Sequence, residues 1–355
     1  MQVVQAPRIG GALLLAVAEP LRQSLLDRPV RMVESEKHVV ALVGPDHAAT
    51  AQRDALPCDS RRSAPRTGWQ DGVVPVLTLM AIHAHPDDES ISTGGVLARY
   101  SAEGVRTVLV TCTDGALGYM PGRIRPGEEG HDERVLARLR IDELNLACER
   151  LGVCHVEMLG YHDSGMAGWQ QNQRPTAFCN QSSDAVATRI VELFERYRPQ
   201  VVVTYFRNTG YNHPDHLHTH DVTVRAVEWS SIPQKLYFTA RSRAGQERMR
   251  EVLAARGIEM PTRRPDQHGA RDVSAPPRRV PGIDDELFTT FVDVVPFLSA
   301  RRAALEAHAS QLHESYFLRA PDDIWAEIYG RETFIQARDT TGTPVPESDL
   351  FAGLR

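Results

Sequence analysis

The sequence predicts an α/β protein with a mostly parallel sheet flanked by helices. Short apolar runs typical of buried strands alternate along the chain with longer segments of helical periodicity. Such alternation indicates βαβ units, whose right-handed crossovers place helices against a parallel sheet. The 355 residues are 42% hydrophobic and 24% charged, which is ordinary for a globular protein and excludes a disordered or collagen-like chain.

The regular pattern begins at residue 73. Strands are expected over residues 73–83, 106–112, 155–159, 201–205, 235–239 and 288–295. Helices are expected over residues 93–103, 132–151, 184–197 and 295–311. In the helix over 132–151, Val135, Leu139, Leu146 and Leu151 approximate one apolar face, and Gly152 suits its end. Five prolines within residues 258–285 predict an irregular excursion there.

Residues 1–72 are predicted to be an N-terminal extension, followed by a catalytic domain over 73–355. Three interpretations of the extension stay open: a small appendage, a partly disordered arm, or an overextended start, since Met80 shortly precedes the first motif. The extension contains no chemistry-bearing cluster and closes with a loop-like run from Cys58 to Gly72. The segment Gly10–Ala18 resembles a short signal-peptide core. A single preceding charge, Arg8, and the weak apolar character favour an ordinary short helix instead, and the run is too short to span a membrane.

Composition excludes some partners and suggests a compartment. A net charge of −6 gives no basic field for nonspecific nucleic-acid binding. The five cysteines are odd in number and form no C-x-x-C pair, so neither a disulfide framework nor a structural zinc knuckle is favoured. We therefore interpret each cysteine as a small buried residue and expect a reducing cytoplasm.

A first polar cluster, Ala84-His-Pro-Asp-Asp-Glu89, directly follows the first strand. In parallel sheets ligands gather beyond the carboxyl ends of the strands, so this turn lies where a site is expected. One imidazole and two adjacent carboxylates offer a metal ligand together with a free base, as a metal that activates water requires. The alternative is a solvated acidic turn.

A second cluster, Tyr211-Asn-His-Pro-Asp-His-Leu-His-Thr-His220, comes shortly after the strand over 201–205. Pro214 suits the first helical position, which places His213 at the N-cap and His216 in the first turn. His218 and His220 are better explained as structural histidines. Two histidine-rich turns, each at the end of a strand, predict that His85 and His216 share one site.

These two motifs resemble the LmbE/PIG-L family of metal-dependent amide hydrolases, over about residues 77–355. The stretch Asp163-Ser-Gly-Met166 and the segment around Arg140 support the resemblance. The similarity is greatest to the mycothiol-pathway branch, which contains N-acetylglucosaminyl-inositol deacetylases and mycothiol S-conjugate amidases. The resemblance implies a Rossmann-like fold, in agreement with the predicted elements.

The resemblance also implies a role for each motif residue. The implied ligands of one Zn²⁺, or of Fe²⁺, are His85, Asp88 and His216. Asp87 matches the general base, and His213 matches the residue that stabilises the oxyanion and protonates the leaving amine. Asp215 matches the carboxylate that orients His213, and Tyr211 matches a tyrosine that assists at the carbonyl. The implied substrate-binding residues are Arg140, Asp163, Ser92 and Tyr119.

Differences from the family pattern bear on the substrate. Tyr119 stands where the inositol deacetylases have an acidic residue, and Phe206, Arg207 and Thr209 also depart from the family near the second motif. Ser92 and Thr93 occupy the stretch in which conjugate amidases carry a lysine, which favours a deacetylase. We therefore expect hydrolysis of an N-acyl aminosugar, with a thiol-conjugate amide as the alternative substrate.

Two other classes remain as alternatives. A metal phosphoesterase also uses His/Asp clusters, but it usually needs basic phosphate ligands, and neither lysine of the chain, Lys37 or Lys235, is near a motif. A sugar-binding module on the same fold would not need Asp87, His213 and Asp215 together. The oligomeric state is left open by the sequence.

Overall fold

A computed structural model describes residues 40–42, 76–207, 211–260, 282–313 and 315–355. Most of the predicted extension over 1–72, including the signal-like segment Gly10–Ala18, lies outside these ranges. The same holds for residues 261–281, which form most of the proline-rich excursion. The predicted boundary between extension and catalytic domain therefore stays a prediction.

The described ranges form an eight-stranded sheet with the order β1-β4-β3-β2-β5-β6-β8-β7. Its first six strands in this order are parallel, whereas β8 is antiparallel to both β6 and β7, so the predicted mostly parallel sheet is confirmed. The strands are β1 (Val40–Leu42), β2 (Thr78–His83), β3 (Arg106–Thr113), β4 (His155–Tyr161), β5 (Val201–Tyr205), β6 (Lys235–Thr239), β7 (Thr290–Asp293) and β8 (Arg331–Asp339).

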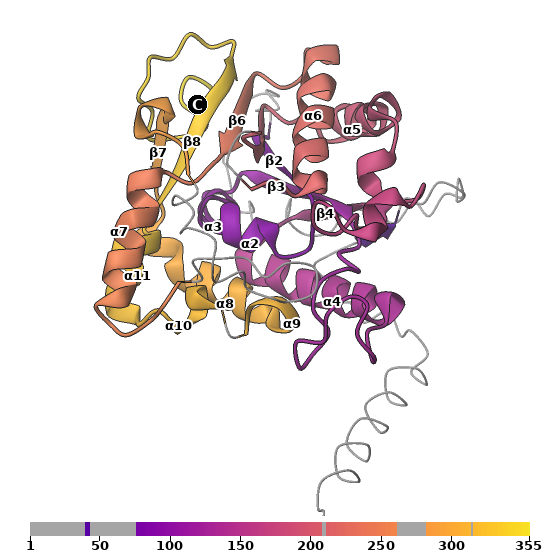
Figure 1. Ribbon diagram of the computed structural model, residues 1–355. Helices are drawn as coiled ribbons and strands as arrows, with labels where there is room; N and C mark the ends of the chain where they lie inside the picture. The colour runs from indigo at the N-terminus through magenta and orange to yellow at the C-terminus, as the bar shows by residue number, and fades with distance from the viewer. Residues whose placement is uncertain (1–39, 43–75, 208–210, 261–281, 314) are drawn as a thin grey trace, which may run out of the picture. The chain divides into compact units, whose positions relative to one another are not determined.

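Helices cover both faces of the sheet (Figure 1). The α-helices are α2 (Asp88–Ser92), α3 (Gly94–Ala102), α4 (Glu133–Leu151), α5 (Ser183–Tyr197), α6 (Pro214–Trp229), α7 (Arg243–Ala254), α8 (Leu298–Ala307), α9 (Ala309–Leu312), α10 (Tyr316–Arg319) and α11 (Asp322–Tyr329). Short 3-10 helices are η2 (Gln170–Gln173), η3 (Phe178–Asn180), η4 (Asp285–Leu287) and η5 (Val295–Phe297).

The central strand β2 explains why the core has two halves. Leu79 and Ala81 face the cluster formed with α3, α4 and α8, while Met80 and Ile82 face the cluster formed with α5 and α6. Because side chains alternate along a strand and both faces are covered, all six residues of β2 are buried. A continuous apolar run is the expected sequence of such a strand.

The strand order places a switch point beside β2. From β2 the chain adds β3 and β4 on one side and then returns to add β5 and β6 on the other. The carboxyl ends of β2 and β5 are therefore neighbours, and the segments leaving them diverge. Open α/β sheets bind ligands in the crevice at such a point.

Two helix predictions need correction. The helix expected over 295–311 is divided into η5, α8 and α9, because the backbone leaves helical geometry at His308 (φ −83°, ψ 51°). In α4 the predicted ends are confirmed, with Asp132 at the N-cap and Gly152 in the left-handed conformation (φ 70°). Its predicted apolar face is wrong in part: Leu151 is buried, but Leu146 is 41% exposed and the buried face includes Arg140.

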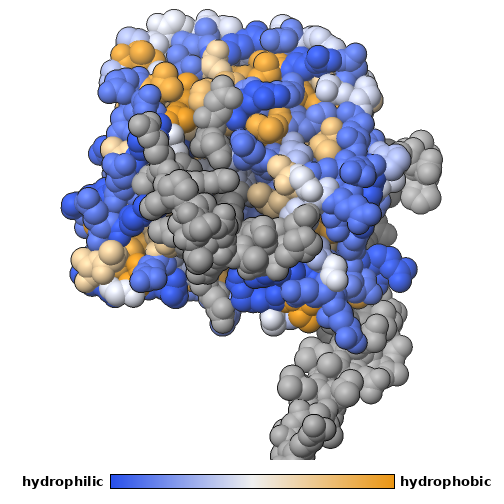
Figure 2. Space-filling view, viewed as in Figure 1, coloured by the Kyte–Doolittle hydropathy of each residue, from blue (hydrophilic) through white to orange (hydrophobic). Residues whose placement is uncertain are grey.

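Hydrophilic residues are prominent on the molecular face in Figure 2, with smaller groups of apolar residues among them. Among the described helices, none combines the length and apolarity needed to cross a lipid bilayer.

At the start of β6, Lys235 is fully buried and its Nζ lies 2.5 Å from Oε1 of Glu347.

The cysteines agree with the prediction in part. Cys112 and Cys148 are buried and free, and Cys179 is free and half-buried. Cys154 is buried, as predicted, but it takes part in a disulfide, so the expectation that no disulfide is favoured is wrong at this residue. Cys58 lies outside the described residues.

Candidate metal centre and active site

The turn after β2 is built around Asp88. Its Oδ2 accepts hydrogen bonds from the backbone N–H of His85 (2.9 Å) and from the Tyr205 hydroxyl (2.8 Å). The Tyr205 oxygen in turn accepts the N–H of Ala84 (2.7 Å), which ties the end of β5 to the end of β2. Tyr205 was not among the predicted site residues, although its place as the last residue of a predicted strand was a usable signal.

The second motif begins α6 as predicted. His213 is the N-cap, its Nδ1 accepts the backbone N–H of Asp215 (3.3 Å), and Pro214 occupies the first helical position. This start places His216 in the first turn, where its ring stacks on the ring of Tyr205 with 4.2 Å between centroids. The start of α6 therefore places the imidazoles of His213 and His216 near the end of β2.

The two motifs meet at the carboxylate of Asp88. Its Oδ2 lies 3.2 Å from Nδ1 of His85 and 3.3 Å from Nε2 of His216. One ligand atom from each of these three residues lies within 4.8 Å of the others, so the group could hold a metal ion. His216 Nε2 is buried and makes no hydrogen bond, as expected of a nitrogen whose lone pair is reserved for a cation.

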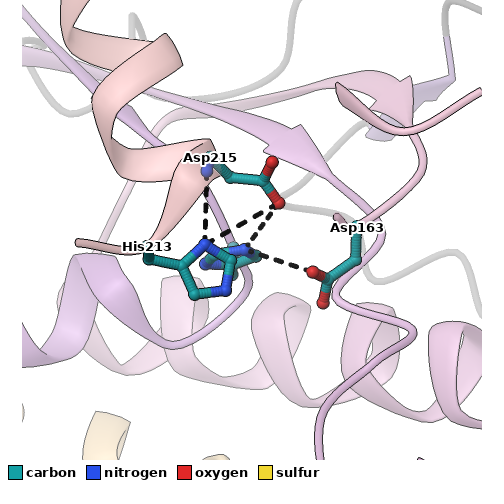
Figure 3. Close-up of side chains that lie close together, drawn as sticks. Asp163, His213 and Asp215 are labelled. Carbon is teal, nitrogen blue, oxygen red and sulfur yellow. Dashed lines mark hydrogen bonds and ion pairs between the residues drawn. The ribbon is translucent and has the colours of Figure 1, made fainter. Parts of the chain in front are cut away.

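The other ring nitrogen of His85 faces a second group, formed with Asp163, His213 and Asp215. Figure 3 shows the side chains of Asp163, His213 and Asp215 close together. His85 Nε2 is 3.2 Å from Oδ2 of Asp215 and 3.6 Å from Oδ1 of Asp163. The Asp215 carboxylate also accepts the backbone N–H (2.9 Å) and the hydroxyl of Ser164. It lies farther from the His213 imidazole, 4.0 Å from Nδ1.

The two groups differ in which carboxylate oxygens the protein donors reach. Both donors to Asp88 bind Oδ2, whereas Asp163 and Asp215 each accept one donor on Oδ1 and one on Oδ2. Asp163 accepts the backbone N–H groups of Leu117 (3.2 Å) and Gly165 (2.8 Å), and Asp215 accepts both donors of Ser164. The protein therefore holds both oxygens of Asp163 and of Asp215, as it does in residues that orient a metal ligand. A carboxylate bound to the far nitrogen of a ligating histidine is a common arrangement, and it fixes the tautomer of the ring.

The electrostatics of the cluster favour a cation. Burial opposes a charge on His85, but Asp163, Asp215 and Asp88 raise its pKa well above the usual value. Burial likewise opposes ionisation of Asp88, but His216 and His85 hold its pKa well below the usual range. Burial lowers the pKa of His213, so the neutral imidazole is favoured there. Positive charge is thus stabilised at His85, between carboxylates.

Asp87 stands beside this cluster with its side chain 16% exposed. Its Oδ2 accepts a hydrogen bond from Nη2 of Arg140 (2.9 Å), yet burial raises the pKa of Asp87 to about 6. Its backbone has a φ of 121°, a conformation that side chains other than that of glycine rarely adopt. Backbone strain of this kind gathers at functional sites, where the surrounding structure enforces it.

The four residues predicted to bind substrate occupy different places. Arg140 is only 3% exposed, and its guanidinium donates to the carbonyls of Gly115 (2.7 Å) and Pro86 as well as to Asp87. Asp163 belongs to the buried group at His85. Tyr119 is half-buried in the loop after β3, and Ser92 is half-buried at the end of α2.

The remaining motif residues border the cluster. The ring of Tyr211 meets the ring of His216 edge-on, with 4.7 Å between centroids. His218 packs against Phe178 with 4.7 Å between ring centroids, and Nδ1 of His220 lies 2.8 Å from the carbonyl oxygen of Tyr205. Neither histidine joins the groups that could hold a metal among the described residues.

Comparison with known proteins identifies the family of this chain. The family described as PIG-L: GlcNAc-PI de-N-acetylase matches residues 80–227, which contain both motifs. A relative from Acidothermus cellulolyticus, named 1D-myo-inositol 2-acetamido-2-deoxy-alpha-D-glucopyranoside deacetylase, is 41% identical over 293 residues, covering 79% of this chain and 96% of its own length. The chain belongs to the PIG-L family. A second relative of the same name, from Thermobispora bispora, is 38% identical and covers 78% of this chain and 98% of its own length.

Among solved structures, this PIG-L chain is similar to an N,N'-diacetylchitobiose deacetylase from Pyrococcus horikoshii. The TM-score is 0.47 at 19% identity, covering 73% of this chain and 83% of the other. The family membership confirms the predicted class, an amide hydrolase with an α/β fold, over the phosphoesterase and the binding module. A buried His/Asp cluster that could hold a metal ion accompanies it.

Proposed function

We propose that the protein removes the acetyl group from an N-acetylglucosaminyl-inositol or a closely similar N-acetyl aminosugar, with Zn²⁺ as its cofactor. The observation that carries the proposal is the meeting of His85, Asp88 and His216 with Asp87 beside them. The names of the relatives from Acidothermus cellulolyticus and Thermobispora bispora support the choice of substrate.

Two imidazoles and one carboxylate, from His85, His216 and Asp88, would hold the ion. Zinc accepts this set of ligands and leaves a position for water or substrate, and Fe²⁺ accepts it also. When bound, the ion lowers the pKa of water and polarises the amide carbonyl. The unbonded Nε2 of His216 supports this assignment, because no protein donor competes for it.

We assign Asp87 as the general base. Its carboxylate is partly exposed beside the ligand set and takes the proton of the attacking water. A pKa of about 6 leaves it ionised at neutral pH while keeping it a stronger base than an exposed aspartate. Arg140 holds one of its oxygens, so the other is available to the water.

We assign His213 to the carbonyl oxygen and the leaving amine. Its Nδ1 accepts the N–H of Asp215, so the neutral ring has its hydrogen on Nε2 and donates it in a hydrogen bond to the developing oxyanion. The proton that Asp87 takes from the water passes to the amine nitrogen beside His213 as the C–N bond breaks, which balances the step. The Tyr211 hydroxyl is assigned to the developing charge on the carbonyl oxygen. For the sugar, Tyr119 and Ser92 remain the proposed contacts. The hydrogen bonds of Arg140 and Asp163 support a further role for both in orienting Asp87 and His85.

The test is to incubate the zinc-loaded protein with N-acetylglucosaminyl-inositol, diacetylchitobiose and a mycothiol-type thiol conjugate, and to identify the products by mass. Release of acetate and the free amine from the first compound supports the proposal. Cleavage of the thiol conjugate alone would replace it with an S-conjugate amidase. Turnover of none of the three would overturn it.

A variant separates the proposed base from the proposed ligands. Asp87→Ala is expected to retain metal and to lose turnover by roughly 10²–10⁴-fold, the usual contribution of a general base. His85→Ala should lose metal as well. Asp221→Ala, which changes an exposed aspartate paired with Arg207, is the control and should keep both properties. Equal metal loss in Asp87→Ala and His85→Ala would show that Asp87 is a ligand.

We also propose that the enzyme works in the cytoplasm, on a small-molecule substrate. The free thiols of Cys112 and Cys148 support a reducing compartment, and the disulfide of Cys154 counts against it. Fractionation of cells that produce the full chain tests the location directly.

A further inference from the structure

The chain leaves helical geometry at His308 in order to bury an imidazole. His308 follows the last residue of α8, its side chain is fully buried, and its Nε2 lies 2.7 Å from Oε1 of Glu89. The two residues are 219 positions apart in sequence. No motif drew attention to His308, and neither proposed metal group includes it.

Glu89 links His308 to the proposed base. Its side chain is fully buried, Oε1 faces His308, and Oε2 accepts the backbone N–H of Asp87 (3.0 Å). One carboxylate therefore bridges a histidine of the C-terminal half and the backbone of the catalytic turn. Oε1 also accepts the Ser90 hydroxyl (2.5 Å), so without His308 the buried carboxylate would keep that one donor and lose its imidazole partner. The Glu89 side chain would then be free to rotate away from the N–H of Asp87.

The backbone at Asp87 needs such a constraint. Three non-glycine residues in the described ranges have positive φ, and two of them, Arg123 (62°) and Arg198 (51°), lie near the left-handed helical minimum. Asp87, at 121°, lies far from that minimum. A residue persists in such a conformation only when its surroundings enforce it. The described hydrogen bonds on Asp87 are those of Glu89 to its N–H, of the Ile91 N–H to its carbonyl (3.1 Å) and of Arg140 to its carboxylate, and among them the Glu89 contact is the one that depends on His308.

We propose that His308 is a positioning residue that, through Glu89, holds the Asp87 backbone in the conformation that presents its carboxylate to the attacking water. The proposal rests on the proposed function, in which Asp87 is the base. Displacing a base by about 1 Å reduces turnover by as much as ~10²-fold, so removal of this link has a measurable kinetic effect.

The first test measures backbone strain and needs neither substrate nor metal. Asp87→Ala and Asp87→Gly differ only by one Cβ, which is costly at positive φ. With His308 present, the glycine variant should unfold at a higher urea concentration than the alanine variant. With His308→Ala added to both, that difference should shrink or vanish, because the turn is free to relax. An unchanged difference would overturn the proposal.

The second test measures catalysis in the zinc-loaded full chain. His308→Ala should lower kcat by about 10–100-fold while KM and the metal dissociation constant stay near those of the wild type. His308→Gln, whose amide can still donate to Glu89, should recover most of the loss. The matched control is His313→Ala, an exposed histidine of the same segment, which should behave as wild type.

The outcomes separate this proposal from the proposed function. If Asp87→Ala keeps turnover, the assignment of the base fails whatever His308 does. If Asp87→Ala loses turnover and His308→Ala retains it, the positioning role alone fails. Should the alanine variant not fold, His308→Met fills the space without offering a donor and takes its place in both tests. A wild-type kcat in that variant would also overturn the proposal.

Discussion

Replacing Ser164 by alanine should weaken metal binding without touching a proposed ligand. Ser164 donates both its backbone N–H (2.9 Å) and its hydroxyl to the Asp215 carboxylate, which lies 3.2 Å from Nε2 of His85. Ser164→Ala removes only the hydroxyl. The Asp215 carboxylate then retains the backbone N–H and His85, and the His85 ring gains freedom to turn away from Asp88.

The size of the effect follows from what Asp215 loses. A hydrogen bond to a buried charged group is worth about 1.5–3 kcal/mol. Residues that orient a ligating histidine typically change metal affinity by 10–100-fold, which corresponds to about 1.4–2.7 kcal/mol. The free energy of the lost hydrogen bond and the free energy of the expected affinity change fall in the same range, since both depend on the Asp215 carboxylate. We therefore expect the dissociation constant for Zn²⁺ to rise by between about tenfold and a hundredfold.

The assay is competition with a chromophoric chelator, performed on the metal-free full chain. Ser310→Ala is the matched control, since the Ser310 hydroxyl also donates to a buried carboxylate, Oε2 of Glu143 (2.7 Å), outside both groups at His85. It should bind Zn²⁺ as the wild type does. A dissociation constant for Ser164→Ala within twofold of the wild type, or an equal loss in Ser310→Ala, would refute the reasoning.

Three further predictions concern stability and reactivity. Burial lowers the pKa of His83 to about 4. Below pH 6.5 the unfolded chain therefore binds a proton that the folded chain does not. The free energy of unfolding falls as the pH drops, by about 2 kcal/mol between pH 7 and 4.5. Urea unfolding should show a smaller fall in His83→Gln, and an identical fall would contradict this. Burial raises the pKa of the Cys112 thiol to about 12, so its thiolate fraction at pH 8 is roughly 10⁻⁴ and Ellman's reagent should label it only after unfolding, as peptide mapping would show. Lys235→Met leaves the buried Glu347 carboxylate without its cationic partner and should lower the free energy of unfolding, measured with urea, by about 3–5 kcal/mol. A decrease below about 1 kcal/mol would be inconsistent with a buried ion pair.

Local chemistry explains what could be predicted of the site. Pro214 and His213 define a helix start through residue types alone, and the structure confirms both positions. The carboxyl ends of parallel strands share one edge of a sheet, so two motifs that follow strands were expected to approach each other. His85 and His216 do so, with 5.3 Å between their ring centroids.

What could not be predicted depends on distant partners. Apolar periodicity predicts the buried face of α4 only in part, because it assigns charged residues to the solvent-exposed face. Arg140 is instead buried, and its guanidinium donates to the carbonyls of Pro86 and Gly115. Nothing local predicts the end of the helix at His308, because the partner of His308 is the Glu89 carboxylate, 219 positions away in sequence. The strand order and the antiparallel β8 likewise have no local signature.

The burial of Lys235 leaves the described surface without a primary amine. The chain has two lysines, and the other, Lys37, lies outside the described residues. Succinimide esters, lysine-directed crosslinkers and acetylating or ubiquitinating enzymes would therefore find no attachment point on the described surface. Surface mapping or immobilisation would have to use guanidinium- or carboxyl-selective reagents, and a lysine introduced by mutation would give a single addressable position on that surface.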